Sequence, residues 1–239
     1  QSGKGLSIAA GPDGTLYVAD ADGRRIREID TDGTIRTLFD AGKSDQYGKV
    51  SQAIATSGDG KVYFGAELHG RQGLCVADRH GNVKQLADAF PTDAFASCID
   101  DIAVDRHGTV YLASSDRFVG RLDTHGKVTT LVTADDLPTD LPASTPDDEH
   151  FDDEPAFAIA TDNAGNVVAA DSRAASLWRI TPDGTVTRLV GARGTGNSGH
   201  GGPADQAQVS QHLTDVAVDD EGTIYFVDVG NSSIKRIDA

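Results

Sequence analysis

The chain has 239 residues, of which 38% are hydrophobic and 24% are charged, and Gly accounts for 27 of them. It contains no run of 18 apolar residues, which excludes a transmembrane helix, and its formal net charge is -16. Because binding to nucleic acid or to an anionic membrane needs an excess of Lys and Arg, we expect no nucleic-acid partner and no direct membrane insertion.

One pattern occurs five times along the chain. Each copy begins with two short apolar strands joined by a turn that ends in Gly, and these glycines lie 46 to 57 residues apart. A third strand follows, and in four copies a second glycine turn leads to a fourth strand. Alternating Val, Ile, Tyr and Thr suit half-buried antiparallel strands, and Asp-Gly turns supply the positive φ of tight hairpins. Four short strands per repeat at this period predict an all-β fold, a β-propeller.

In chain order, the first two strands of the repeats are expected within 6–20, 52–66, 100–114, 157–171 and 214–228. The third strands are expected at 24–30, 73–78, 118–123, 176–181 and 233–238, and the fourth strands at 34–39, 82–87, 127–132 and 185–190. The fifth repeat stops after its third strand. We therefore expect one domain over 1–239, built of five repeats of which the last lacks its outer strand. The alternative is an incomplete six-bladed ring.

Two stretches of the repeat resemble the NHL-repeat family of β-propellers, in its bacterial form. They are the I-A-V-D-x-x-G-x-(I/V)-Y-(V/F)-(A/V)-D core and the R-I-x-x-x-D-G-T-V-x-x-L stretch. The glycine-rich segment 194–208 is similar to a connection common in bacterial members, although His200 stands where an Asp is usual. The resemblance implies the propeller fold, but the family includes protein binders, RNA binders, sensor ectodomains and lyases.

The connections of such a fold divide between two faces. The short glycine turns share one face, whereas the connections between second and third strands and between repeats share the other. The long segments 40–51, 88–99, 133–156 and 191–213 all belong to this second set. Long loops on a rigid scaffold are the usual place for binding, so we expect the ligand on this long-loop face.

Carboxylates and a few arginines are predicted to gather on the long-loop face, at the ends of the first and second strands. The candidate binding residues are Asp20, Asp22, Arg24, Asp100, Asp101, Asp171, Arg173, Asp215, Asp228, Asn231 and His200. Their functional interpretation is a site for a cationic or polar ligand, or for a metal. The competing interpretation is structural, because an Asp at the end of the second strand recurs in three repeats, as a loop-capping residue would.

Segment 133–156 carries nine carboxylates and neither Lys nor Arg. Its prolines prevent long regular structure, so one interpretation is a solvated acidic loop kept extended by repulsion. A second is a docking strip for a basic partner. A third is a Ca²⁺ site, because Ca²⁺ takes six to eight oxygen ligands. The candidate metal ligands are Asp147, Asp148, Glu149, Asp152 and Asp153.

Histidine and cysteine give two further hypotheses. Propeller lyases that resemble the family place zinc-binding histidines around the axis, and no inner strand of this chain carries a matching His. A metal site built from His200, His212 and an Asp is the remaining hypothesis for metal binding by histidine.

Cys75 and Cys98 lie in adjacent repeats, where they either form one disulfide or remain free thiols.

These observations favour a non-catalytic binding or sensor module, secreted or otherwise extracytoplasmic. Its partner would be a protein, a peptide or a carbohydrate held on the long-loop face. The alternative is a metal-dependent propeller lyase or lactonase with an axial site.

Overall fold

The computed structural model describes residues 6–20, 24–69, 71–88, 99–114, 117–138 and 157–239. Each sequence repeat forms one antiparallel sheet, and the strands follow one another in chain order across it. Within these residues, four sheets have four strands and the last has three, as predicted. Among the described residues the only helical segments are four short 3-10 turns, η1 to η4. None of these is long and apolar enough to cross a membrane.

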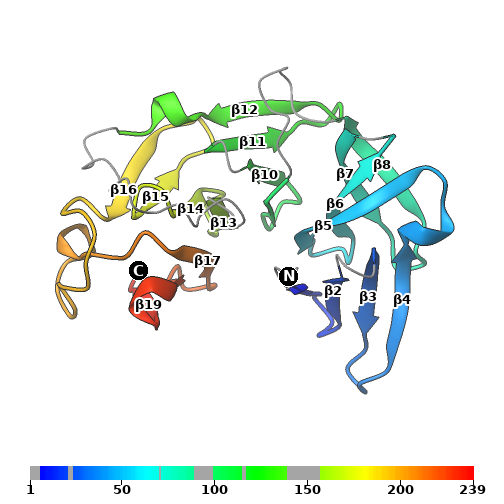
Figure 1. Cartoon of the computed structure of the whole chain (residues 1–239), viewed down its shortest axis with the longest axis horizontal. Helices are drawn as coiled ribbons and strands as arrows, with labels where there is room; N and C mark the ends of the chain where they lie inside the picture. Colours follow the sequence, from blue (N-terminus) through cyan, green and yellow to red (C-terminus); the bar gives the residue numbers. More distant parts are fainter. Residues whose placement is uncertain (1–5, 21–23, 70, 89–98, 115–116, 139–156) are drawn as a thin grey trace. The chain divides into compact units, whose positions relative to one another are not determined.

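The strands agree with the predicted segments to within a few residues (Figure 1). The first sheet comprises β1 (Leu6–Ala10), β2 (Leu16–Asp20), β3 (Arg25–Ile29) and β4 (Ile35–Asp40), and the second comprises β5 (Tyr47–Thr56), β6 (Val62–Leu68), β7 (Arg71–Ala77) and β8 (Val83–Asp88). The third comprises β9 (Asp101–Val104), β10 (Val110–Ser114), β11 (Phe118–Leu122) and β12 (Val128–Val132). The fourth comprises β13 (Phe157–Thr161), β14 (Val167–Asp171), β15 (Ser176–Ile180) and β16 (Val186–Val190), and the fifth comprises β17 (Leu213–Val218), β18 (Ile224–Asp228) and β19 (Ser233–Ile237).

Strand β5 is longer than the sequence indicated, because residues 47–51 of the expected connection 40–51 belong to it. The strand begins at Tyr47 and pairs with β6 as far as Leu68, through two irregularities in register. The ring of Tyr47 meets that of Phe39 edge-on at 5.1 Å between centroids. This aromatic contact ties the start of β5 to the end of β4 and accounts for the early start of the strand.

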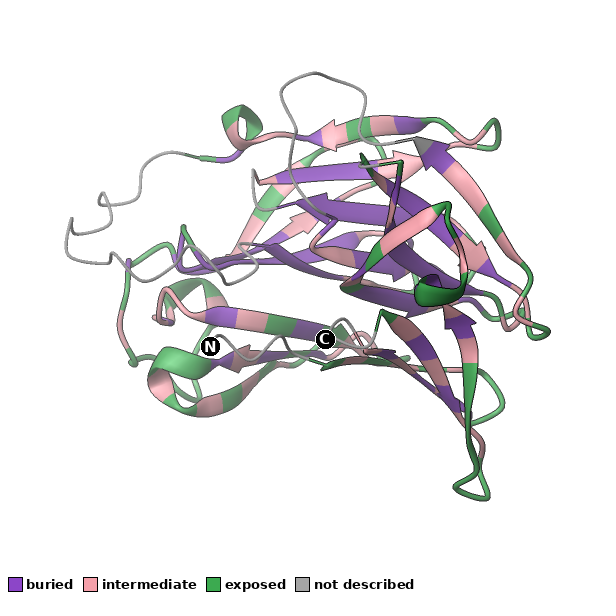
Figure 2. Ribbon diagram, turned by 45° about the vertical axis from the view of Figure 1, so that its right-hand side comes forward, coloured by how far each residue is buried: buried purple, intermediate pink, exposed green. Residues whose placement is uncertain are grey.

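Contacts divide the chain into two compact units, residues 1–112 with 120–129 and residues 113–119 with 130–239. In the first unit, Phe39 packs against Phe64 and Ile26 in a buried cluster. In the second, Leu177 and Phe226 belong to a cluster that joins the fourth and fifth sheets. In Figure 2 the buried residues lie mainly on the strands, and the turns between strands are mostly exposed. The prediction of a single domain over 1–239 stays a prediction.

A recurrent contact links successive sheets. In the first, second and fourth sheets, the fourth strand carries a one-residue bulge at Leu38, Leu86 and Leu189. For Leu38 and Leu86, the glycine of the second hairpin turn in the next sheet approaches the carbonyl oxygen of the leucine. A Cβ added to Gly81 would lie 2.5 Å from the oxygen of Leu38, and one added to Gly126 would lie 2.8 Å from that of Leu86. We call this contact the bulge–glycine joint.

Candidate functional site

The loops between second and third strands share one unusual backbone position. In each sheet a residue one or two positions before the third strand has a left-handed φ of 45–58° although it is not glycine. These residues are Arg24, His69, Arg117, Ala175 and Ser232. Since this conformation is unfavourable for side chains other than Gly and, to a lesser degree, Asn and Asp, the surrounding contacts must hold it in place. Each of the five sheets therefore has an equivalent, conformationally fixed turn before its third strand.

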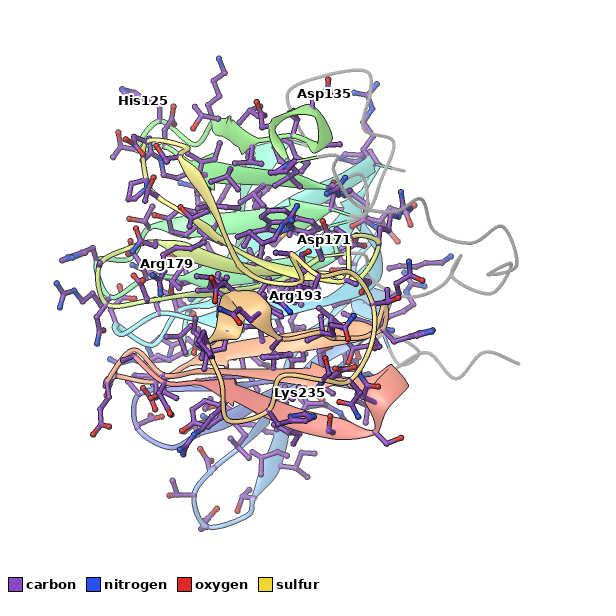
Figure 3. The ribbon with its side chains drawn as sticks, turned by 90° about the vertical axis from the view of Figure 1, so that its left-hand side faces the viewer. His125, Asp135, Asp171, Arg179, Arg193 and Lys235 are labelled. Atoms are coloured by element: carbon purple, nitrogen blue, oxygen red, sulfur yellow. The ribbon has the colours of Figure 1, made fainter. Side chains whose placement is uncertain are left out.

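Asp171, which is labelled in Figure 3, lies at the end of β14 and is fully buried. Its Oδ2 accepts from Nε and Nη2 of Arg117 at 3.0 and 2.7 Å and from Nε1 of Trp178 at 3.1 Å. Its Oδ1 accepts from the amide of Ala174 at 3.1 Å. Burial raises the pKa of Asp171, and the positive charge of Arg117 opposes that rise. Both carboxylate oxygens are thus used inside the protein, which supports the capping interpretation for this residue.

Asp228, at the end of β18, is buried in the same way but has other partners. Its Oδ2 accepts from Nζ of Lys235 and from Nδ2 of Asn231, both at 2.8 Å, and Ser210 donates to Oδ1. Burial by itself would raise the pKa of Asp228, but the hydrogen bonds from Lys235, Ser210 and Asn231 outweigh it and hold the pKa below its usual value. Asn231 also donates to the carbonyl of Gly196 at 2.9 Å. Asp228 and Asn231 therefore anchor the connection 191–213.

Three predicted residues at the starts of inner strands are placed less deeply. Asp101 accepts from the amide of Ile102, and Asp215 accepts from the amide of Val216, each at 2.8 Å. Asp100 is half-buried just before β9. Asp215 keeps solvent exposure, although partial burial raises the pKa of its carboxyl group. These two hydrogen bonds fix the carboxylates at the ends of their own strands.

The remaining predicted residues differ in their surroundings. Asp20 is half-buried opposite Arg25, and Arg24 donates to the carbonyls of Gly48 and Tyr47 at 2.9 and 3.1 Å. Arg173 is exposed. Asp22 and the candidate calcium ligands Asp147, Asp148, Glu149, Asp152 and Asp153 lie outside the described residues. Within the described part of the chain, no group of three or more His, Cys, Asp or Glu could hold a metal ion.

A groove of about 600 Å³ lies between the glycine-rich part of the connection 191–213 and strand β19. Its apolar lining includes Val190, Val209 and Phe226, and Ser198 and His200 contribute polar groups. His200, one of the predicted residues, is exposed and forms a hydrogen bond through Nε2 with Oδ1 of Asn197 at 3.1 Å. This groove is the candidate site of the second unit.

The glycine-rich wall of the groove is held by a local network. Gln208 donates from Nε2 to the carbonyls of Arg193 and Thr195 at 3.1 and 3.0 Å, and its Oε1 accepts from Ser198 at 2.8 Å. Lys235 donates to Oδ1 of Asn197 at 2.9 Å and so links the wall to β19. The connection is therefore ordered before any ligand arrives, which reduces the entropic cost of binding.

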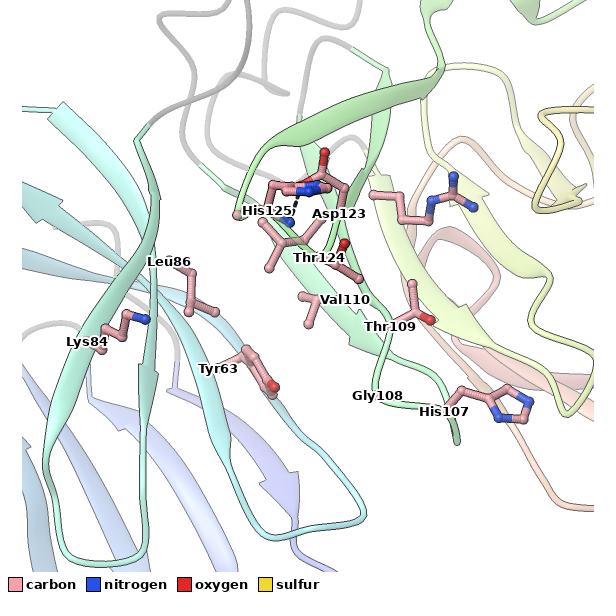
Figure 4. A pocket seen from close by; sticks show the side chains of 13 residues that line it. Tyr63, Lys84, Leu86, His107, Gly108, Thr109, Val110, Asp123, Thr124 and His125 are labelled. Carbon is pink, nitrogen blue, oxygen red and sulfur yellow. Dashed lines mark hydrogen bonds between the residues drawn. The ribbon is translucent and has the colours of Figure 1, made fainter.

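The structure also contains cavities lined by the short glycine turns, where we predicted no site. One of about 700 Å³ lies between the second and third sheets and is lined by Tyr63, Lys84, Asp123 and His125 (Figure 4). Another of about 470 Å³ lies between the first and second sheets and includes Tyr17. Tyr17 and Tyr63 occupy the same position of the repeat, and that recurrence was the one available signal.

Comparisons with known proteins give the fold but no family. No family model matches the chain, and no curated protein sequence matches it. Among solved structures, virginiamycin B lyase from Staphylococcus aureus matches 100% of this chain and 68% of its own, with 14% identity and a TM-score of 0.63. A streptogramin B lyase structure matches 99% of this chain at 17% identity and a TM-score of 0.63. The chain has a β-propeller fold.

Two further propellers show how varied such neighbours are. The calcium-binding protein regucalcin from Agrobacterium tumefaciens matches 98% of this chain and 70% of its own, with 16% identity and a TM-score of 0.60. An auxiliary nutrient binding protein from Bacteroides thetaiotaomicron matches 97% of this chain at 13% identity and a TM-score of 0.66. The chain spans 65% of the streptogramin B lyase and 58% of the nutrient binding protein. At such identities the likeness extends to the fold alone.

Proposed function

We propose that this propeller, of the NHL type, is a non-catalytic binding module that acts outside the cytoplasm. Its ligand would be a protein, a peptide or a carbohydrate, held in the groove between the connection 191–213 and β19. The observation that carries the proposal is the groove itself, because a long connection of the long-loop face forms one wall of a cavity of about 600 Å³.

The chemistry of the groove suits a neutral or mildly basic ligand. Apolar side chains such as Val190, Val209 and Phe226 lie beside exposed polar groups of the glycine-rich wall. Arg236 pairs with Asp238 at 2.9 Å, and Lys235 pairs with Asp228 at 2.8 Å, so both nearby cations already have carboxylate partners. The net charge of -16 adds a long-range attraction for cationic ligands.

The test is a binding screen against peptide and glycan arrays with three proteins. Ala207 lines the groove and is half-buried, so Ala207→Trp should fill it. Thr124 lines the cavity between the second and third sheets, so Thr124→Trp is the matched control. We expect a ligand that binds the wild-type protein and Thr124→Trp but loses at least tenfold in affinity with Ala207→Trp. A ligand lost only with Thr124→Trp would move the site to the short-turn face and overturn the proposal.

The second candidate is the metal-dependent lyase or lactonase. Two observations favour it. The first is the presence of lyases among the structural neighbours. The second is Asp215, which a solvent molecule can reach although partial burial raises the pKa of its carboxyl group, a combination found in general acids. Elemental analysis of protein purified without chelators separates the two candidates. A stoichiometric metal that is lost in an Asp215→Asn variant would favour the enzyme.

A further inference from the structure

The cavity of about 700 Å³ between the second and third sheets has a fixed, partly apolar wall. All its lining residues belong to the first compact unit. Leu86 and Tyr63 extend toward it from the second sheet, and Val110 faces them from the third (Figure 4). Leu86 and Gly126 form one of the bulge–glycine joints, and both line the cavity, so the joint holds its two sides together. Cavities of about 300–1,000 Å³ hold small organic ligands.

The charged side chains around this cavity favour an anion, although the whole chain has a net charge of -16. Lys84 and Arg121 line the cavity, whereas Asp123 is the only carboxylate among its lining residues. Two histidines, His107 and His125, also belong to the lining. The local charge is therefore opposite in sign to that of the whole chain.

Lys84 is the cation best placed to meet a ligand. It is exposed on β8, and its side chain extends from the second sheet toward the third (Figure 4). Within the described part of the chain, ion pairs engage Lys61 and Lys235 but none engages Lys84. The hydroxyl group of Tyr63 likewise has no hydrogen-bond partner among the described residues. An ammonium group and a hydroxyl group are thus available beside an apolar wall.

The backbone amides of the neighbouring turns already have acceptors. Asp123 accepts from the amide of His125 at 2.8 Å, and Asp105 accepts from the amides of His107 and Thr109, both at 2.8 Å. Loops that bind phosphate groups commonly use free amides of this kind. Because these amides are occupied, a ligand must be held by side chains, which suits one carboxylate better than a phosphate group.

The equivalent cavity between the first and second sheets carries the opposite charge. Three carboxylates line it, those of Asp13, Asp59 and Asp78, and its cations are Lys61 and Arg79. Lys61 already pairs with Asp59. The same position of the repeat is therefore acidic in one place and basic in the next, so the basic lining is a property of these side chains and not of the fold.

We propose that the cavity between the second and third sheets binds a small organic carboxylate with an apolar body. The carboxylate group pairs with Lys84, and the apolar body packs against Leu86 and Val110. This site goes beyond the proposed function, because the groove beside β19 is a separate cavity in the second unit and suits neutral or mildly basic ligands.

Titration followed by NMR of the backbone amides tests the site. The probes are benzoate, 2-naphthoate and hexanoate, each compared with its primary amide, which keeps the apolar body and removes the charge. We expect at least one carboxylate to bind saturably, to shift the amides of Leu86, Val110 and Gly126, and to bind roughly tenfold or more tightly than its amide. If none of the three binds, or if the amides bind as tightly, the proposal is wrong.

Three variants locate the binding. Thr124→Trp should fill the cavity and Lys84→Gln should remove the pairing charge, and each should weaken binding of the carboxylate roughly tenfold or more. Both positions are exposed, so the fold should be kept. Lys49→Gln removes the same charge from an exposed position on β5 of the same sheet, outside the cavity, and should leave the affinity unchanged. An equal loss with Lys49→Gln, or no loss with the other two, would overturn the proposal.

The two sites can fail independently. Ala207→Trp should abolish binding of a groove ligand and leave carboxylate binding unchanged, because Ala207 lines the groove alone. Loss of the carboxylate site with an intact response to Ala207→Trp would remove this inference and keep the proposed function.

Discussion

Arg117 reaches Asp171 with two of its nitrogens, Nε at 3.0 Å and Nη2 at 2.7 Å, and both donate to the same oxygen, Oδ2. The two side chains are 18% and 0% exposed, so the pair joins a left-handed turn of the third sheet to the end of β14 in the core.

Removing one partner of this pair should destabilise the protein strongly. Asp171→Ala leaves a guanidinium group without its partner, and Arg117→Met leaves a carboxylate in the core, so each should lower the free energy of unfolding by about 3–5 kcal/mol. The double variant should cost clearly less than the sum of the two. Urea denaturation of all four proteins measures the coupling, and additive losses would contradict the pairing.

The bulge–glycine joint predicts different costs for two equivalent glycines. Gly33 and Gly126 have φ of 85° and 80°, so an Ala at either position incurs a similar backbone cost, about 1–2 kcal/mol. A Cβ at Gly33 meets no described atom within 4 Å, whereas one at Gly126 meets the oxygen of Leu86 at 2.8 Å. Gly126→Ala should therefore cost roughly 1–3 kcal/mol more than Gly33→Ala in the same denaturation assay. Equal losses would mean that the joint adjusts freely.

The two buried aspartates should respond to acid in opposite directions. The pKa of Asp228 lies below its usual value of 3.8, so its stabilising contribution is present above that value and is lost as the pH falls. The difference in Tm between the wild type and Asp228→Asn should therefore shrink from pH 7 to pH 3. Asp171 has a raised pKa, so the Tm of the wild type should increase relative to that of Asp171→Asn as the pH falls over the same range. A Tm difference that stays the same from pH 7 to pH 3 in both pairs would contradict these predictions.

Cys75 should be unreactive in the folded protein. It is buried in β7, forms no disulfide in the structure, and burial raises its pKa to about 12. Since the thiolate is the reactive form, labelling by maleimide at pH 7.5 should be at least tenfold slower in the folded state than in urea. Cys98 lies outside the described residues, so the experiment uses the Cys98→Ser variant, in which Cys75 is the only thiol. Rapid labelling without denaturant would show that β7 opens readily.

The acidic segment gives a prediction that depends on residues outside the described part. A Ca²⁺ site within 133–156 should raise the Tm by mass action, because it binds the folded chain alone. Millimolar CaCl₂ is compared with NaCl of equal ionic strength, on the intact chain and on one with residues 139–156 replaced by a short Gly/Ser linker. We expect a Ca²⁺-specific increase in the intact chain only. Equal increases in both chains would place the ion elsewhere.

Much of the fold could be predicted from the sequence, because hairpin turns and alternating apolar residues are local signals. The three-stranded last sheet follows directly from counting strands in the fifth repeat, and the strands of each sheet lie in chain order as expected. The early start of β5 was missed, since it depends on Tyr47 meeting Phe39, a contact between strands that no local pattern contains.

The site was harder to predict because the same residue type serves two purposes. Asp171 and Asp228 carry the charge expected of a ligand-binding group, but their burial depends on Arg117 and Lys235, which are distant or unremarkable in sequence. The alternative that a recurrent Asp caps a loop was visible in the repeat and fits both residues. The groove at β19 could not be foreseen, because it exists only where a connection folds back over the edge of a sheet.

The bulge–glycine joint has two unlike halves, a protruding leucine carbonyl on the outer strand of one sheet and a glycine on the hairpin of the next. Because its two halves differ, a contact of this kind joins sheets head to tail, and the contact itself does not limit how many sheets follow one another. The joint therefore fixes how closely two successive sheets approach at this point, but it does not determine the number of sheets. Wherever the joint is present, one pair of surfaces is used again, so a single local geometry serves several contacts between sheets.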